Sequence, residues 1–194
     1  MRYGIIIGIA LCVTIIGCDL LQTRTPQQPS QQSSFITPTS PDVVIQNFQN
    51  AIDNRDAVSY TRCFSDSSRS AYAFRFTPAA DAQQYASTFL TWTIGDETAY
   101  FKNLSTQTAA ANTFDVFLDS LTTIASTADS TVYTALYTLN AQHSDPTKPT
   151  QARGTMRLTI KADPLTQQWA ITQWIDVSNG TNASWSVMKA RFLQ

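Results

Sequence analysis

Charged side chains interrupt several segments that otherwise alternate like β-strands, and these residues have the chemistry of acids and bases. They are Asp115, Asp119, Arg157 and Asp176. Because successive side chains of a strand point to opposite faces, we expect them on the face opposite the apolar residues, as a solvent-exposed row. Alternatively, curvature of the sheet turns that face inward, and Asp115 or Asp176 is a general base for proton abstraction. Tyr133 or Tyr137 would then donate to the oxyanion.

Other catalytic chemistries lack the residues they need. His143 is the only histidine, which excludes a histidine-rich metal site and a two-histidine acid-base pair. With Asp145 two residues further on and prolines nearby, His143 is expected to be a solvated residue of a hairpin loop. There is no glycine-rich phosphate loop and no Gly-x-Ser-x-Gly elbow. We therefore expect no metal, no cofactor and no hydrolytic nucleophile.

Large aromatic residues raise a second possibility, a pocket for an apolar ligand. Such pockets are mainly hydrophobic with few polar groups, but aromatic residues at a seam between helices and a sheet more often fill the core. The residues that fit either interpretation are Trp92, Tyr100, Phe101, Trp169, Trp174 and Trp185. The candidate ligand-binding set keeps four of these residues, Trp92, Tyr100, Trp169 and Trp174, and adds two polar ones, Tyr137 and Asp176.

The start of the chain carries the chemistry of an acylated thiol. The apolar run over residues 5–16 has about a dozen residues, whereas a membrane-spanning helix needs about 20. Arg2 before the run and Gly17 after it are typical of a cleaved export signal. The tetrad Ile15-Ile16-Gly17-Cys18 resembles the lipobox of bacterial lipoproteins. This resemblance implies that Cys18 receives a diacylglycerol and becomes the new amino terminus; the alternative is an ordinary secretory signal that happens to contain a cysteine.

The chain divides into three parts on this interpretation. Residues 1–17 are the signal peptide, residues 18–40 are the lipidated cysteine and a disordered tether rich in Gln, Ser, Thr and Pro, and residues 41–194 are one domain. We expect the protein in the bacterial cell envelope, anchored to a membrane by lipid and facing the periplasm or the exterior. Asp19 resembles the inner-membrane retention signal of enterobacterial lipoproteins, and the choice between inner and outer membrane stays open.

The charge and cysteine content of the chain limit the classes of partner and of cross-link that it can have. The formal net charge is -1 and there is no run of lysines or arginines, so the electrostatic footprint of a nucleic-acid-binding protein is absent. Once Cys12 leaves with the signal and Cys18 is acylated, Cys63 remains alone. We expect it to be buried beside Phe64, as a small hydrophobic residue.

Periodicity predicts the elements that position these residues. Helices capped by Ser40 and Thr93 are followed by period-two strands. A short second helix lies between them, and its Val58 and Tyr60 side chains are expected to face the core. The helical segments are 40–56, 57–64 and 93–104, and the strand segments are 71–76, 113–126, 130–143, 151–163 and 167–178. In the last strand the inner face is expected to hold Trp169, Ile171, Ile175 and Val177. Residues 184–194 fit either a helix or a strand.

This order of elements resembles the nuclear transport factor 2-like fold, an α+β cone with amino-terminal helices packed on a curved antiparallel sheet. Three stretches look like poorly characterised bacterial lipoproteins of this superfamily: "PDVVIQNFQNAIDNRDAVSYTRCFSD", "WTIGDETAYFKNL" and "WAITQWIDVSNGTNASWSVMKARF". The resemblance implies a pocket at the open end of the cone. It is compatible with binding proteins and with isomerases and dehydratases that use cavity carboxylates.

The sequence therefore predicts a non-enzymatic, lipid-anchored module that binds a small apolar ligand or another envelope protein. The alternative is a small isomerase-like or dehydratase-like enzyme with a cavity carboxylate.

Overall fold

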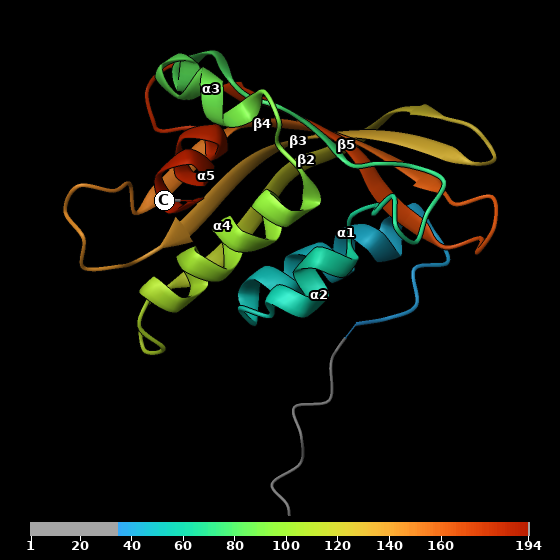
Figure 1. Ribbon diagram of the computed structural model, residues 1–194, viewed down its shortest axis with the longest axis horizontal. Coiled ribbons are helices and arrows are strands. Elements are labelled where there is room, and N and C mark those ends of the chain that lie inside the picture. Colours follow the sequence, from blue (N-terminus) through green and yellow to red (C-terminus); the bar gives the residue numbers. More distant parts are fainter. Residues whose placement is uncertain (1–34, 194) are drawn as a thin grey trace, which may run out of the picture. The chain divides into compact units, whose positions relative to one another are not determined.

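The computed structural model describes residues 35–193, so the expected signal peptide, Cys18 and most of the expected tether lie outside the described residues. The elements in chain order are α1 (Pro41–Asp53), α2 (Ala57–Arg62), β1 (Arg75–Thr77), η1 (Ala80–Tyr85), α3 (Ala86–Phe89), α4 (Ile94–Gln107), β2 (Phe114–Ser126), β3 (Ser130–Ala141), β4 (Gln151–Ala162), β5 (Trp169–Ser178) and α5 (Trp185–Leu193) (Figure 1). None of the described helices has the length and apolar character needed to cross a bilayer.

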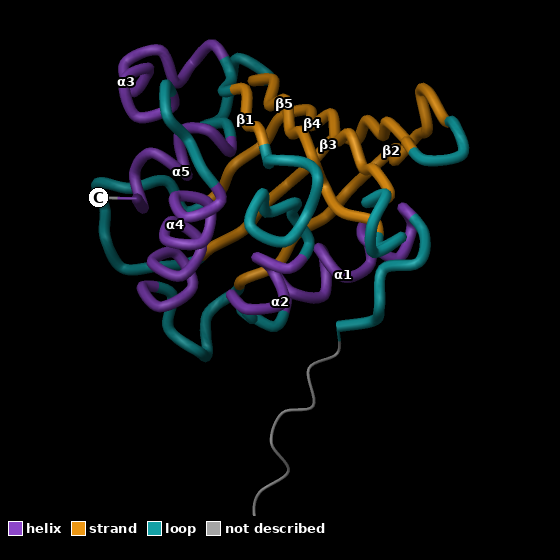
Figure 2. Tube along the Cα trace, turned by 45° about the vertical axis from the view of Figure 1, so that its right-hand side comes forward, coloured by secondary structure: helices purple, strands orange, loops and turns teal. Residues whose placement is uncertain are grey.

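A five-stranded sheet forms one layer and the helices form the other. The strand order is β1-β5-β4-β3-β2; the last four are an antiparallel meander, and the short β1 runs parallel to β5 at the edge. Figure 2 shows the sheet curving over helices gathered on one side of it. The expected α+β class, with helices packed on a curved antiparallel sheet, is confirmed.

The helix caps follow the expected chemistry. The Ser40 hydroxyl accepts the amide hydrogen of Val43 at the start of α1. At the start of α4, Thr93 and Asp96 form a reciprocal capping box. Residues 185–193 form a helix, which decides the alternative that the sequence left open. Val58 is 71% exposed, so the expectation that it faces the core is wrong.

The inner face of β5 differs from the expected one. Thr159 pairs with Gln173 and the next residue, Ile160, pairs with Ile171, which leaves Thr172 as an extra residue in β5. Such a bulge reverses the alternation beyond it. Trp174 and Asp176 therefore point into the core. The prediction that Ile175 and Val177 are core residues is wrong, since Val177 is 50% exposed.

Aromatic rings fill the concave side of the sheet. Tyr60 of α2 stacks on Phe101 of α4 with ring centroids 3.9 Å apart. Trp174 of β5 meets Trp185 of α5 edge to face, with centroids 4.7 Å apart. Cys63 is buried at this seam, as expected. These aromatic residues join the helices to the sheet, and their rings supply much of the apolar surface that is buried in the fold.

Candidate functional site

The terminal helix α5 carries a lysine into the centre of the domain. Lys189 is completely buried, and its Nζ lies against both carboxylate oxygens of Glu97, from the first turn of α4. Four aromatic rings surround the same ammonium group, with centroids 4.0 to 5.7 Å from Nζ; they belong to Phe76, Trp92, Tyr100 and Trp174. A charge this deep is tolerated because an opposite charge and ring faces replace water.

Glu97 has further donors. Tyr60 Oη donates to Oε1 at 2.7 Å and Trp92 Nε1 donates to Oε2 at 2.8 Å. The carboxylate is 0% exposed, so its charge is balanced entirely from within the protein. Since the helix backbone and the capping box fix α4 at this turn, Glu97 is held rigidly.

A second carboxylate lies close by on β5. Asp176 is 2% exposed and accepts hydrogen bonds from Tyr137 Oη at 2.7 Å, from the Ser186 amide at 2.7 Å and from Ser186 Oγ at 2.6 Å. Tyr137 Oη in turn accepts from the Trp185 amide at 2.7 Å, and Trp185 Nε1 donates to Tyr100 Oη at 2.6 Å. The first turn of α5 is thereby fastened to β3, β5 and α4.

The buried groups have shifted pKa values. Burial lowers the pKa of Lys189 to about 8, against the opposing effect of Glu97, so the amine stays protonated at neutral pH. Burial raises the pKa of Asp176, while the bonds from Ser186 and Tyr137 act in the opposite direction. Burial also raises the pKa of Tyr137, so this phenol remains a donor.

The structure brings together five of the six residues of the candidate ligand-binding set. Trp92, Tyr100, Tyr137, Trp174 and Asp176 meet around Lys189 and Trp185 in this interior cluster, whereas Trp169 lies elsewhere, at the start of β5. Sequence reasoning missed Glu97, Lys189 and Ser186. One signal was present: Lys189 follows Trp185 by four residues and precedes Phe192 by three, which puts it on the apolar stripe of α5.

The other acid-base candidates do not belong to this interior cluster. Asp115 accepts from Asn140 Nδ2 at 2.7 Å, beside the β2–β3 ladder on the outer face of the sheet. Tyr133 Oη donates a hydrogen bond to Asp42 of α1. Burial, and to a smaller extent this carboxylate, raises the pKa of Tyr133 to about 12. His143 lies in a loop as expected but is half-buried, with its ring centroid 5.0 Å from that of Phe192.

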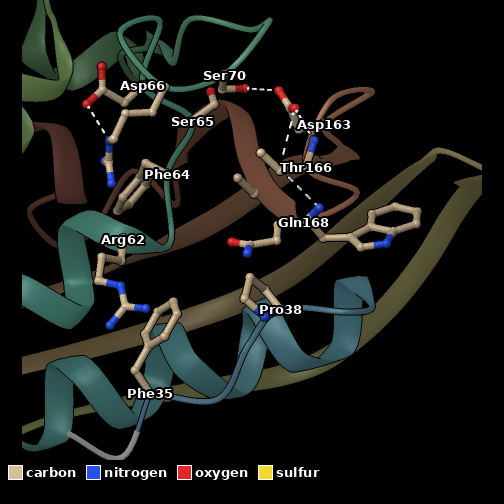
Figure 3. A pocket seen from close by; sticks show the side chains of 13 residues that line it. Phe35, Pro38, Arg62, Phe64, Ser65, Asp66, Ser70, Asp163, Thr166 and Gln168 are labelled. Atoms are coloured by element: carbon tan, nitrogen blue, oxygen red, sulfur yellow. Dashed lines mark hydrogen bonds and ion pairs between the residues drawn. The ribbon is translucent and has the colours of Figure 1, made fainter.

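An open pocket lies at the opposite end of β5 (Figure 3). It has a volume of about 250 Å³, and its apolar walls come from Phe35, Pro38, Phe64 and Trp169. The Arg62 guanidinium, at the end of α2, lies 3.9 Å from the ring centroid of Phe35. Pro38 is fixed because its carbonyl accepts the Trp169 amide at 2.8 Å.

Two carboxylates line this surface pocket, and both already have donors. Asp163 is 4% exposed and accepts from the amides of Ala71, Leu165 and Thr166 and from Ser70 Oγ, at 2.7 to 2.9 Å. These bonds hold the pKa of Asp163 well below its usual range, and the bond from Ser70 makes the largest contribution. Asp66 accepts from the Ser68 amide and from Arg69 Nε.

A second open hollow, with a volume of about 540 Å³, lies between α2 and α4. Arg62 and Arg69 line both hollows. Across residues 35–193 no group of three or more His, Cys, Asp or Glu side chains is placed to hold a metal ion. The described chain therefore offers a sealed polar interior and two adjoining open hollows.

Comparisons with known proteins identify the fold. No protein-family model matches the chain, and no curated protein sequence does. Among solved structures, the β subunit of benzoate 1,2-dioxygenase from Burkholderia mallei matches with a TM-score of 0.50 and 12% identity, over 72% of this chain and 88% of that one. A protein from Novosphingobium aromaticivorans, provisionally named a scytalone dehydratase, matches with a TM-score of 0.51 and 7% identity, over 69% and 78% of the two chains.

A nuclear transport factor 2-like superfamily protein from Salmonella enterica has a TM-score of 0.49 and 12% identity, over 68% of this chain and 83% of that one. At these identities the likeness concerns fold and carries no activity. With its helices packed in the curve of an unclosed five-stranded sheet, this chain shares an α+β fold with the dioxygenase β subunit and the Novosphingobium aromaticivorans protein.

Proposed function

We propose that this protein is a lipid-anchored bacterial envelope protein whose domain binds a ligand or a partner protein at its surface and does not catalyse a reaction. One observation carries the proposal: the two interior carboxylates, Glu97 and Asp176, are buried, and each of their oxygens already accepts at least one hydrogen bond.

A general base needs a lone pair within reach of the substrate proton. Glu97 faces a lysine, a phenol and an indole, and Asp176 faces a phenol, an amide and a hydroxyl. A substrate could reach either group only by displacing α5, which supplies Lys189 and Ser186. Displacement of α5 would leave Glu97 without its counter-ion and Asp176 without the two bonds from Ser186, at a cost of several kcal/mol. The interior thus supports a structural role.

A cavity-carboxylate enzyme is the second candidate. Its support is the raised pKa of Asp176 beside the phenol of Tyr137, the combination expected of a base next to an oxyanion donor. Two of the fold neighbours carry enzyme names, a dioxygenase subunit and a dehydratase. This candidate requires α5 to leave the interior during turnover.

The lipid anchor in the proposal rests on the tetrad that ends at Cys18 and on the short apolar run before it. A single acyl chain binds membranes only marginally, whereas the two or three chains of an acylated cysteine hold a protein durably. The domain would then work beside a membrane without inserting into it.

A compound screen with two readouts tests the non-catalytic role. The chain from Asp19 onward, which keeps every described core residue, is screened by thermal shift and, in parallel, for turnover of each stabilising compound. We expect stabilisation without turnover. The Asp176→Asn variant is run beside wild type; an activity that this substitution abolishes while the variant stays folded would replace our proposal with the enzyme.

A further inference from the structure

The two open hollows meet at Arg62 and Arg69 and together form a groove across the end of α2. We infer that this groove binds an anionic amphiphile, with its acidic head at the two arginines and its apolar tail between α2 and α4. The inference rests on the proposed binding function and adds the class of ligand.

The head end offers two guanidinium groups that keep N–H donors free for a ligand. Among residues 35–193, the Arg62 side chain has no hydrogen-bond or ion-pair partner, and one face of its guanidinium is stacked on Phe35, which leaves its N–H edges for a ligand. Arg69 uses Nε for Asp66 at 3.1 Å and keeps its two terminal nitrogens. Lys102 of α4, which lines the same hollow as the two arginines, adds a third, exposed cation. Guanidinium groups bind carboxylates and phosphates well because their donors are arranged as a fork.

Three carboxylates lie near this end and offset part of its positive charge, but their oxygens are occupied by local donors. Asp56 caps α2 by accepting from the amides of Val58 and Ser59 and from Ser59 Oγ, at 2.6 to 3.0 Å. Asp163 and Asp66 are held by the donors described above. Because these acidic oxygens already accept local hydrogen bonds, the polar groups left for a ligand in the groove are mainly donors.

The tail end is apolar although two threonines line it. The Thr61 hydroxyl lies 2.7 Å from the Ala57 carbonyl oxygen of its own helix, and the Thr98 hydroxyl lies 2.8 Å from the Ile94 carbonyl oxygen of its own helix. The two hydroxyls are also 3.0 Å from each other. Their polar atoms are therefore occupied in the helix seam. Val58, 71% exposed, completes this wall. A hollow of about 540 Å³ is within the usual range for ligand sites, about 300 to 1,000 Å³.

Ligands with the same ten-carbon chain and different head groups test whether the groove requires a negatively charged head and an apolar tail. The chain from Asp19 onward is titrated calorimetrically with decanoate, decanol and decyltrimethylammonium, and with acetate as the head alone, all below the micellar range. We expect decanoate to bind about tenfold more tightly than decanol, and acetate and the cation to bind too weakly to measure. Equal binding of decanoate and decyltrimethylammonium would overturn the inference.

Variants locate the site. The Arg62→Ala/Arg69→Ala double variant should weaken decanoate binding about tenfold. The matched control, Arg153→Ala/Arg157→Ala, removes two exposed arginines of β4 and should bind as wild type does. For the tail, Val58→Asp should abolish binding, and Leu90→Asp, at an 83% exposed site outside the groove, should not. An unchanged affinity in the Arg62/Arg69 variant also overturns the inference.

The same head and tail chemistry occurs in free fatty acids and in phospholipids. Sedimentation with phosphatidylcholine vesicles, with and without phosphatidylglycerol, separates these sources: binding that needs phosphatidylglycerol and is lost in Arg62→Ala/Arg69→Ala assigns the lipid, and decanoate binding alone assigns the free acid. If no anionic amphiphile binds but the compound screen yields another ligand without turnover, the inference fails and the proposed function stands. Turnover that depends on Asp176 defeats the proposed function instead.

Discussion

Lys189 and Glu97 are the residues that distinguish this interior from an ordinary apolar core. Two ions removed from water stabilise a fold little as a pair, but each strongly needs the other once both are buried. Four aromatic rings around Nζ leave no room for water to compensate a lost partner. The pair therefore fixes where α5 sits against α4.

Removing only the lysine should be costly. We expect Lys189→Met to lower the free energy of unfolding by about 3 to 5 kcal/mol, because it strands the Glu97 carboxylate. The double variant Lys189→Met/Glu97→Gln should lose less than Lys189→Met alone. Urea unfolding measures both, with Lys102→Met, at an exposed lysine, as a control expected within about 0.5 kcal/mol of wild type. A double variant as unstable as the sum of the single variants would contradict this role.

Asp163 gives a prediction in pH. Its donors depress the pKa in the folded state below that of an unfolded aspartate, about 3.9. The stabilisation is therefore complete above that value and is lost as pH falls toward the folded pKa. Asp163→Asn should be less stable than wild type at pH 5, and urea midpoints should converge as pH falls from about 4 to 2. A constant difference over this range would show that the bonds do not depend on the charge.

At the scale of elements, most of the fold followed from the sequence. Caps at Ser40 and Thr93 and the change of period after residue 112 predicted the long helices and all four long strands. The expected strand at 71–76 shrank to Arg75–Thr77, because the bonds to Asp163 hold residues 70 and 71 in a loop. Local propensity does not contain such a long-range contact.

The candidate site was predictable only in part, for the same reason. Aromatic content indicated Trp92, Tyr100 and Trp174, but one bulge at Thr172 decided that Asp176 points inward. A bulge shifts alternation by one residue and leaves little trace in composition. The pairing of Glu97 with Lys189 joins residues 92 positions apart, which no periodicity reveals.

Gly154 of β4 tests how closely β4 is packed against β3 and β5. A Cβ there would lie 2.5 Å from the Val177 carbonyl oxygen and 2.6 Å from Tyr137 Oη. We expect Gly154→Ala to cost about 1 to 3 kcal/mol, because it pushes Tyr137 from Asp176. Gly95→Ala, in α4, meets only Thr93 Oγ1 at 3.4 Å and should be neutral or stabilise by up to about 1 kcal/mol. Thermal unfolding compares the two; equal melting temperatures would contradict the packing described.

At the scale of the whole molecule, the proposal places the described domain at a membrane through a lipid on Cys18. Substitution of Cys18, which lies outside the described domain, separates the proposed anchoring from folding of the domain.

Cys18→Ser should remove the anchor. Because serine cannot form the thioether, we expect no incorporation of radiolabelled palmitate and no recovery with the membrane fraction, with Cys63→Ser as the matched control that keeps both. Labelling or membrane recovery that persists in Cys18→Ser would contradict the proposed anchor.

The central claim, that the interior is structural and recognition occurs outside it, is tested most directly by the four tryptophan indole resonances. Trp92, Trp174 and Trp185 report on the interior, and Trp169 lines the surface pocket. When the chain is titrated with a stabilising compound and followed by nitrogen-15 NMR, we expect the indole resonance of Trp169 to shift and those of Trp92, Trp174 and Trp185 to stay in place. Shifts of the three interior indoles that track binding, without movement of Trp169, would contradict our account.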